Sequence, residues 1–332
     1  MAKQQRFDPK TLPARNTPVP PSAKSKSGRP GGRPPGVAPI HKATAADWIA
    51  GARLRTVPLA IGPVLLGTAT AYVLGEGAFH WVRALLCLAV ALGLQIGVNY
   101  ANDYSDGIRG TDDKRVGPAR LTGSGAAKPR TVLTVALVFF ALAAAAGLLV
   151  VILSGQYILL AVGAAAIVAG WFYTGGKKPY GYFGLGELFV FVFFGLVATA
   201  GTTFVQVGTV NLETWLAGVA VGLFACAVLI ANNVRDIAQD KLAGKRTLSV
   251  LIGDRASRIL YAVLMIVPFG ILGFFTLLYD NAAYTFFVLL AAVPAIIITI
   301  TAKTAAELIL VLKLTTLTSL VFSIGLAWAI AF

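Results

Sequence analysis

Two clusters of amide and carboxylate side chains are the residues of this sequence best suited to chemistry. They are Asn99-Tyr-Ala-Asn102-Asp103-Tyr-Ser-Asp106 and Asn232-Asn233-Val-Arg-Asp236-Ile-Ala-Gln-Asp240. A helix turns by about 100° per residue, so the main oxygen-bearing side chains of the first cluster fall within about 60° of one another, and those of the second within about 80°. Each cluster therefore directs its oxygen atoms to one side, as a cation site requires.

The ligand atoms in these clusters are oxygens only, because neither cluster contains a His or a Cys. Hard oxygen ligands suit Mg²⁺ rather than Zn²⁺, and Mg²⁺ in proteins usually combines one or two carboxylates with substrate phosphate groups. We therefore predict a Mg²⁺ site that draws on both clusters. Its predicted ligands are Asn99, Asn102, Asp103, Asp106, Asn232, Asp236 and Asp240.

The two clusters repeat at a fixed distance along the chain. Asn99 and Asn232 are 133 residues apart, and so are Asp103 and Asp236. This equal spacing predicts an internal duplication of a helical unit. The two acidic ends are then expected to face one shared cavity.

Basic side chains follow both clusters and suit a phosphate ligand. Arg binds phosphate oxygens through two parallel N–H donors, and Lys supplies a compact positive charge. Beside carboxylates that hold a metal ion, such groups form a cradle for a diphosphate. The residues assigned to diphosphate binding are Arg115, Arg120, Lys177, Lys245 and Arg246. Lys177 is explained equally well by the charge bias that orients membrane proteins.

The composition places these clusters in a membrane protein. Apolar residues make up 57% of the chain, only 13% are charged, and the mean hydropathy is +0.77, which excludes an ordinary soluble globular fold. A net charge of +14 would suit nucleic acid in a soluble protein, but its distribution here argues for orientation in a lipid bilayer. Cys87 and Cys226 lie inside apolar runs and predict no disulfide.

Apolar runs long enough to cross a bilayer, which takes about 20 residues per helix, predict nine spans and an all-α polytopic membrane fold. The predicted spans are 57–74, 84–102, 132–153, 158–173, 188–207, 215–231, 259–279, 284–302 and 314–331.

The basic residues fix the orientation of these spans. If the first loop, 75–83, lies outside, all of the 28 Lys and Arg residues except Arg83 fall on the inner side. This asymmetry predicts a cytoplasmic amino terminus, both clusters at cytoplasmic helix ends, and the carboxyl terminus outside. Residues 1–43 are basic and rich in Pro, which predicts a disordered cytoplasmic tail ahead of a membrane domain at 44–332.

Both clusters resemble the aspartate-rich motifs of the UbiA superfamily of intramembrane aromatic prenyltransferases. Several stretches are most similar to its MenA branch, which acts on 1,4-dihydroxy-2-naphthoate in menaquinone synthesis. These stretches are Arg53-Leu-Arg-Thr-Val-Pro, Asn102-Asp-Tyr-Ser-Asp-Gly, Arg115-Val-Gly-Pro-Ala-Arg120 and Asn233-Val-Arg-Asp-Ile-Ala-Gln-Asp-Lys-Leu-Ala-Gly-Lys-Arg-Thr.

The first cluster departs from the superfamily pattern at one position. The general motif is Asn-xxx-Asp-xxx-Asp, which places the second Asp four positions after the first. Here Asp106 stands three positions after Asp103, and Gly107 occupies the fourth position. The sequence leaves open whether Asp106 or Asp112 supplies the next ligand.

The resemblance implies a nine-helix bundle with a lipid-facing cavity and a cytoplasmic loop cap, in the bacterial cytoplasmic membrane. It implies that Mg²⁺, held by four catalytic aspartates, binds the diphosphate of a polyprenyl donor, and that the naphthoate ring gains the prenyl group and loses CO₂. The aspartates are Asp103, Asp106, Asp236 and Asp240. Arg53 or Arg55 would hold the ring carboxylate, although an interfacial anchor explains both equally well. The oligomeric state is not predicted.

Two other functions stay open from the sequence. Another acceptor, as in the homogentisate, 4-hydroxybenzoate or haem O branches, is compatible with the same spacing. A cation-coupled transporter also uses intramembrane acids and repeated helical units. Transporter acids are expected near the middle of a span, whereas both clusters here end their spans and lead into basic loops, which favours the enzyme.

Overall fold

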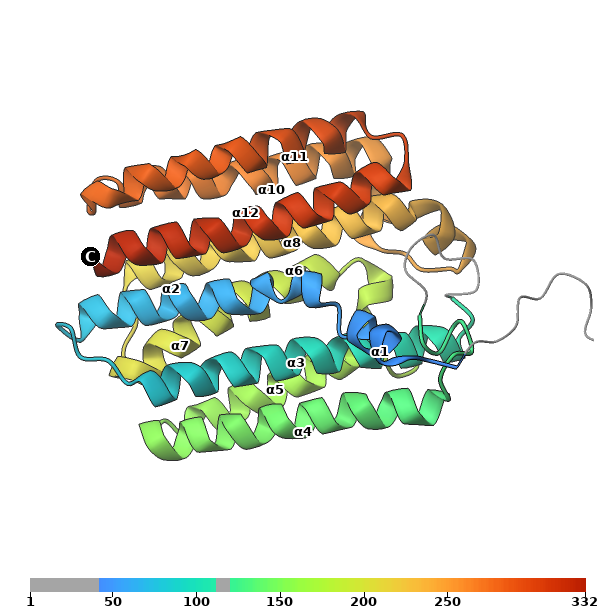
Figure 1. Cartoon of the computed structure of the whole chain (residues 1–332), viewed down its shortest axis with the longest axis horizontal. Coiled ribbons are helices and arrows are strands. Elements are labelled where there is room, and N and C mark those ends of the chain that lie inside the picture. The colour runs from blue at the N-terminus through green and yellow to red at the C-terminus, as the bar shows by residue number, and fades with distance from the viewer. Residues whose placement is uncertain (1–41, 112–119) are drawn as a thin grey trace, which may run out of the picture. The chain divides into compact units, whose positions relative to one another are not determined.

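The computed structural model describes residues 42–111 and 120–332, which belong to one compact unit. The predicted tail at 1–43 therefore lies almost entirely outside the described residues. Every regular element of the described chain is helical, and Figure 1 shows the long helices side by side, with α1 at one end of the bundle and the carboxyl terminus at the other. The predicted all-α fold is confirmed.

The helices of the first part of the chain are α1 (Ala45–Gly51), η2 (Leu54–Thr56), α2 (Pro58–Leu74), α3 (Trp81–Ile108), α4 (Pro129–Ser154) and α5 (Ile158–Phe172). Those of the second part are η3 (Tyr180–Phe183), α6 (Gly186–Val190), η4 (Phe191–Val197), α7 (Ala198–Val207), α8 (Leu212–Leu242), α9 (Leu248–Ile252), α10 (Asp254–Phe275), η5 (Asp280–Val288), α11 (Leu289–Thr301) and α12 (Ala305–Ala331).

Seven helices in the described chain are long and apolar enough to cross a membrane. An eighth span results if the bent pair Ala45–Thr56 and Pro58–Leu74, which turns by 45°, is counted as one. The predicted span 158–173 corresponds to α5, which is apolar but has only 15 residues and is therefore not among the helices long enough to qualify. The chain is thus a multi-pass membrane protein, and the predicted number of nine spans is not confirmed.

Two helical hairpins of the bundle repeat with the predicted offset. Shifted by 133 residues, the bounds of α2 coincide with those of the continuous segment η4–α7, and the bounds of α3 fall within those of α8. Thr70 on α2 and Thr203 on α7 are equivalent in this register, and their hydroxyl oxygens lie 2.9 Å apart. Equivalent residues meet in this way across a two-fold relation, so the structure supports the predicted duplication.

Helix α8 is the most buried of the candidate spans, and an aromatic cluster packs against it. Phe224 on α8 meets Phe322 on α12 edge to face at 5.1 Å between ring centroids, and Phe269 on α10 at 6.1 Å. Edge-to-face aromatic pairs contribute about 0.5–1.5 kcal/mol beyond the area that they bury. This packing fixes the position of α8, the helix that carries the second cluster.

The segment η4 is π-helical, an arrangement that occurs in short stretches, often at functional sites. Gly195 in η4 packs so closely on Gly222 of α8 that a Cβ atom there would lie 2.6 Å from the Gly222 Cα. The close approach requires glycine. It holds η4, which carries Phe193, against α8.

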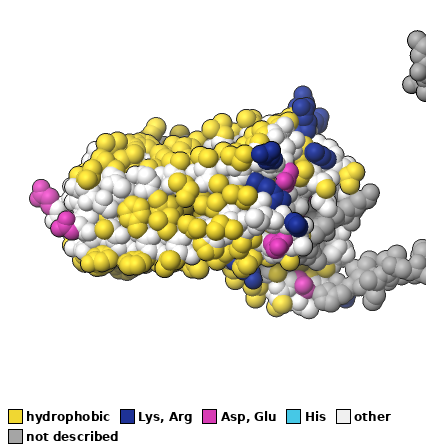
Figure 2. Space-filling view, turned by 90° about the horizontal axis from the view of Figure 1, so that it is seen from above, with side chains coloured by type: hydrophobic (Ala, Val, Ile, Leu, Met, Phe, Trp, Pro, Cys, Tyr) yellow, Lys and Arg dark blue, Asp and Glu magenta, His cyan; other side chains and the backbone are white. Residues whose placement is uncertain are grey.

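The charged residues gather at one end of the bundle. Figure 2 shows Lys and Arg concentrated near one end, while hydrophobic side chains cover the middle. Arg83 near the opposite end is held by backbone carbonyls, with its guanidinium donating to Leu153, Val205 and Gln206. The distribution is that of a protein with one strongly basic membrane face.

Candidate active site

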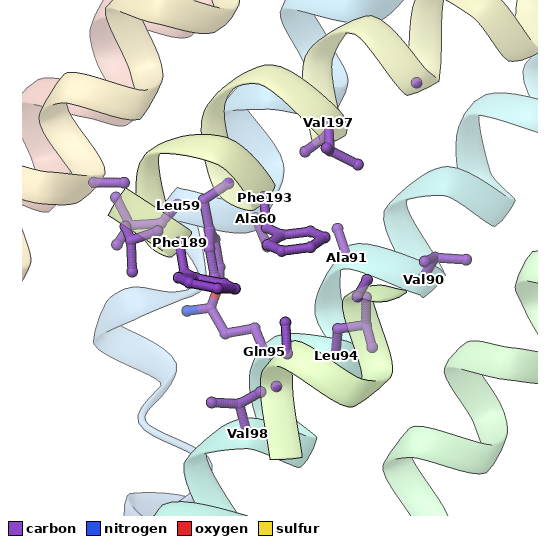
Figure 3. A pocket seen from close by; sticks show the side chains of 18 of the residues that line it. Leu59, Ala60, Val90, Ala91, Leu94, Gln95, Val98, Phe189, Phe193 and Val197 are labelled. Carbon is purple, nitrogen blue, oxygen red and sulfur yellow. The ribbon is translucent and has the colours of Figure 1, made fainter. Parts of the chain in front are cut away.

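A cavity of about 310 Å³ lies between α2, α3, α5 and the η4–α7 segment. Its walls are mostly apolar, and Figure 3 shows Phe189, Phe193, Val197, Val90 and Leu94 around it. One end is polar, because its lining includes Arg53, Asn99, Asn102 and Asn232. Since Asn99 and Asn102 come from α3 and Asn232 from α8, residues of both clusters line this single cavity.

Asn99 and Asn232 occupy equivalent positions, both line the cavity, and both use their amide nitrogen in a hydrogen bond to a backbone carbonyl. The Asn99 side-chain amide donates to the carbonyl of Ala52 at 3.0 Å, and that of Asn232 donates to the carbonyl of Val228 at 3.3 Å. A carbonyl only accepts, so these bonds fix which end of each amide is the nitrogen. The amide oxygens are left for a ligand, and an amide oxygen suits a hard divalent cation.

Asp103 is only 1% exposed, and both of its oxygens face the loop that follows the segment 112–119. Oδ2 accepts from the backbone N–H of Leu121 at 2.9 Å, and Oδ1 accepts from that of Thr122 at 2.8 Å. A carboxylate with two such donors ties the loop to α3. The predicted metal ligand is thus also the anchor of the loop that carries Arg120.

The same loop explains the departure from the superfamily motif at Gly107. A Cβ atom at this position would lie 2.4 Å from Cγ2 of Thr122, which is closer than any real contact. Only glycine fits where the loop packs on α3, so no carboxylate can stand there. Asp106 is the carboxylate that remains at this helix end, and Asp112 lies outside the described residues.

Asp106 is 2% exposed, and cationic and hydroxyl groups from three separate segments contact its carboxylate. Lys245 Nζ lies 3.0 Å from Oδ2, and an Arg120 nitrogen lies 3.9 Å from the same oxygen. The Tyr182 hydroxyl donates to Oδ1 at 2.7 Å. The structure thus brings together two of the residues predicted for diphosphate binding, Arg120 and Lys245, around one buried carboxylate.

Tyr182 completes this group in a way that the sequence analysis missed. Burial, followed by the nearby charge of Asp106, raises the pKa of the Tyr182 phenol well above its usual value. The hydroxyl therefore stays protonated and keeps donating. Arg109 and Lys245 both lie over its ring, at 5.6 and 4.8 Å from the centroid. Arg109 also donates to the carbonyls of Thr174 and Gly176, which joins the α3 end to the loop after α5.

The second cluster has a different arrangement. Asp236 makes a two-point ion pair with its neighbour Arg235, whose Nε lies 2.7 Å from Oδ1 and whose NH2 lies 2.6 Å from Oδ2. The Arg235 side chain is fully buried. Asp240 is half-buried and lies 3.5 Å from the Thr247 hydroxyl. Asp236 thus neutralises a guanidinium inside the bundle, a partner that the motif alone did not reveal.

Of the remaining predicted residues in the described chain, only Arg53 lines the cavity. Lys177 and Arg246 are exposed, and Arg55 is half-buried but does not line the cavity. Arg115 falls in 112–119, outside the described residues. Arg53 lines the cavity and has a left-handed backbone, with φ 55° and ψ 54°. That conformation costs a non-glycine residue about 1–2 kcal/mol, and such strain often marks functional positions.

The donor set fits a divalent cation by its chemistry. Asn side chains from both halves line the polar end of the cavity, and the buried carboxylates Asp103 and Asp106 follow on the same helix as Asn99, although they are not part of the lining. All of these donors are oxygens, the kind that Mg²⁺ prefers. In the described part of the chain, no three His, Cys, Asp or Glu side chains converge as a preformed site. A divalent cation here would be held by amide and carboxylate oxygens together with oxygens of a bound substrate.

The fold and the site define a multi-pass membrane protein with an apolar cavity whose polar end is lined by three Asn side chains and Arg53. The chain belongs to the UbiA prenyltransferase family, which matches residues 60–308. The predicted family is confirmed.

Individual relatives agree with this family. The chain is 50% identical over 304 residues to the 1,4-dihydroxy-2-naphthoate octaprenyltransferase of Mycobacterium tuberculosis, with 87% of this chain and 98% of that protein covered. The apo UbiA homolog from Aeropyrum pernix K1 is 18% identical, with a TM-score of 0.62 over 82% of this chain and 95% of that one. A UbiA homolog from Archaeoglobus fulgidus bound to GPP and Mg²⁺ is 17% identical, with a TM-score of 0.51 over 84% and 99%.

Proposed function

We propose that this protein transfers a polyprenyl group from polyprenyl diphosphate to 1,4-dihydroxy-2-naphthoate, with release of diphosphate and CO₂, in menaquinone biosynthesis. The observation that carries the proposal is the 50% identity to the mycobacterial octaprenyltransferase across 98% of its length. The apolar cavity with one polar end supports it, because the donor has an apolar chain and a charged head.

The polar end of the cavity suits the diphosphate. We propose that Lys245 and Arg120, which lie beside Asp106, attract the negative charge that grows on the leaving group as the allylic C–O bond breaks. Arg115, Lys177 and Arg246 are the further cations proposed for this role. A divalent cation at this end, for which we propose Mg²⁺, would supply additional charge neutralisation to the diphosphate. The residues proposed to hold it are Asn99, Asn102, Asp106, Asn232, Asp236 and Asp240. Asp103, which the sequence also predicted as a ligand, is proposed to hold the loop at Leu121 and Thr122 instead, because both of its oxygens accept N–H groups from that loop.

The apolar part of the cavity suits the isoprenoid chain and the reaction itself. Phe189 and Phe193 stack at 6.2 Å between ring centroids and belong to the apolar lining of the cavity. The C–O bond of the donor breaks with its electron pair on the diphosphate, and a C–C bond forms to the electron-rich ring. The ring carboxyl leaves as CO₂. Arg53, in the same cavity, is proposed to hold that carboxylate before it leaves, whereas Arg55 does not line the cavity.

We place the protein in the bacterial cytoplasmic membrane, with the basic end of the bundle in the cytoplasm. The amino terminus and the active site are then cytoplasmic, and the carboxyl terminus is outside. The basis is the positive-inside rule applied to the residues gathered at that end.

The proposal is tested in membranes that contain the expressed protein, supplied with a polyprenyl diphosphate and 1,4-dihydroxy-2-naphthoate. With Mg²⁺, we expect a prenylated naphthoquinol whose mass lacks the carboxyl group, and EDTA should abolish it until Mg²⁺ is restored. Membranes with the Asp106→Asn variant serve as the matched control. Prenylation of another aromatic acceptor instead would reassign the substrate, and an intact diphosphate with every acceptor would contradict prenyl transfer.

A further inference from the structure

Gln95 is a buried polar residue in the apolar part of the cavity, and the proposed function assigns no contact to it. It lies on α3, one turn before Asn99, is 4% exposed and lines the cavity. Figure 3 shows its side chain extending into the space that Phe189 and Phe193 also enter. A carboxamide in such surroundings needs partners for both its nitrogen and its oxygen.

The partner of the nitrogen is known, and it fixes the orientation of the amide. Nε2 donates to the backbone carbonyl of Thr56, which can only accept. Oε1 is therefore the atom left over, and it is buried without any hydrogen-bond partner in the described chain. A buried acceptor left unsatisfied costs about 1–3 kcal/mol.

Packing does not explain the amide. In the register of the internal repeat, the counterpart of Gln95 is Val228 on α8, which lines the same cavity. At the equivalent position of the second half, an apolar side chain is therefore sufficient to line the cavity. The carboxamide is an addition specific to the α3 side, where Arg53 and Thr56 approach.

The chemistry of the two substrates decides which of them meets Oε1. An isoprenoid chain has no hydrogen-bond donor, and an ionised diphosphate only accepts. The dihydroxynaphthoate ring brings O–H donors, and one of them bonds internally to the adjacent carboxylate. The hydroxyl farther from the carboxylate is the donor left free.

We infer that Gln95 binds the aromatic acceptor, with Oε1 accepting a hydrogen bond from the ring hydroxyl farther from the carboxylate. The inference rests on the proposed function and names a binding residue for its second substrate. Its geometry agrees with a carboxylate at Arg53, because Gln95 bonds to Thr56 and the Thr56 N–H bonds to the Arg53 carbonyl at 2.8 Å. The single turn from Arg53 to Thr56 thus links the two residues proposed to contact the ring, Arg53 and Gln95.

The first test needs no variant. Binding of 1,4-dihydroxy-2-naphthoate and of 1-hydroxy-2-naphthoate, which lacks only the second hydroxyl, is compared for the wild-type protein in nanodiscs by competition. We expect the dihydroxy compound to bind about tenfold tighter or more, since a site built to bond a hydroxyl rejects an analogue that lacks it. Equal affinities would overturn the inference, and would mean that water satisfies Oε1.

The second test uses Gln95→Met, which keeps the length of the side chain and removes the acceptor. We expect the preference for the dihydroxy compound to disappear and the KM for the acceptor to rise about tenfold, while the KM for the polyprenyl diphosphate stays within about twofold. Gln156→Met, which makes the same change outside the cavity lining, should keep the wild-type preference. An unchanged preference in Gln95→Met would overturn the inference.

The two proposals fail in different ways. A wild-type protein that prenylates no dihydroxynaphthoate overturns the proposed function, and this inference with it. A wild-type protein that prenylates the ring but shows no dependence on the second hydroxyl overturns the inference alone.

Discussion

The ends of α3 and α8 carry similar motifs at equivalent places in the two halves, yet their carboxylates have different partners. Asp103 accepts two backbone N–H groups from a loop, whereas its counterpart Asp236 pairs with a buried arginine. Asp106 gathers a lysine, an arginine and a tyrosine, while the equivalent position on α8 is Gln239. A repeated motif has thus diverged into two differently partnered helix ends.

The difference shows what each half contributes to the site. The α3 end is the more buried of the two and fixes the loops around it. The α8 end is half-buried at Asp236 and Asp240 and keeps its shape through one internal ion pair. The features that stay common are Asn99 and Asn232, which both line the shared cavity and both donate from the amide nitrogen to a backbone carbonyl. The two halves are thus alike in the Asn residues proposed to hold the cation, and they differ in the partners of the neighbouring carboxylates.

The largest effect is expected for Asp106→Asn. This change leaves Lys245 and Arg120 near the site without their common carboxylate, and removing one partner of a buried pair typically costs about 3–5 kcal/mol. We expect turnover to fall more than about 100-fold, with a lower melting temperature. The control is Gln239→Asn at the equivalent position of α8, which should stay within about twofold of wild type. Equal losses in both variants would contradict the asymmetry.

The next effect separates two roles of Asp236. Asp236→Asn should destabilise the protein by about 3–5 kcal/mol, because the buried Arg235 loses its counter-charge, and should abolish turnover. Adding Arg235→Met removes the unpaired charge, so thermal unfolding should recover most of the stability. Turnover should stay lost if Asp236 also holds the cation. A double variant with restored turnover would show that Asp236 serves only Arg235.

Sequence patterns revealed the parts of the site that depend on local spacing. Two oxygen-rich helix ends and the basic loops after them are visible because their residues are neighbours in the chain. Partners from distant segments were not visible: the loop at Leu121 that Asp103 anchors, the Tyr182 hydroxyl on Asp106, and the open oxygen of Gln95. A single glutamine in an apolar run has the pattern of a packing residue until the fold shows which atom lacks a partner.

The membrane spans show the same limit. Hydropathy located the long apolar helices of the described chain and gave α5 nearly its observed bounds, but it counted this run as a span, although α5 has only 15 residues and is not among the helices long enough to qualify. Gly107 is a further case. Its departure from the superfamily motif was visible in the sequence, whereas the reason, contact with Thr122, depends on a loop that packs on the helix from later in the chain.

A smaller effect is expected for Asp103→Asn, the counterpart of the Asp236 change. An amide can accept only one of the two loop N–H bonds well, and a lost bond to a charged group is worth about 1.5–3 kcal/mol. Hydrogen exchange at Leu121 and Thr122 should quicken, and turnover should fall about tenfold because Arg120 is displaced. Unchanged exchange at both amides, with turnover lost completely, would instead assign Asp103 directly to the cation.

The smallest effect is expected for Tyr182→Phe, and it depends on pH. The pKa of Tyr182 is raised in the folded protein, first by burial and then by Asp106. Below about pH 10 both folded and unfolded states hold this proton, so stability does not vary with it. At higher pH the unfolded chain loses the proton first, and stability falls as pH rises toward the folded pKa.

Removing the hydroxyl should therefore have opposite consequences in the two ranges. At pH 7.5, Tyr182→Phe should lose about 1–2 kcal/mol of stability with the hydrogen bond to Asp106. Above about pH 10 its decline should be shallower than that of wild type, by at most about 1.4 kcal/mol per pH unit. Melting temperatures across this range measure both, with Tyr104→Phe on the same helix end as control. A parallel decline in both proteins would mean that the phenol is no part of the α3 group, and the contrast between the two helix ends would then rest on Lys245 and Arg120 alone.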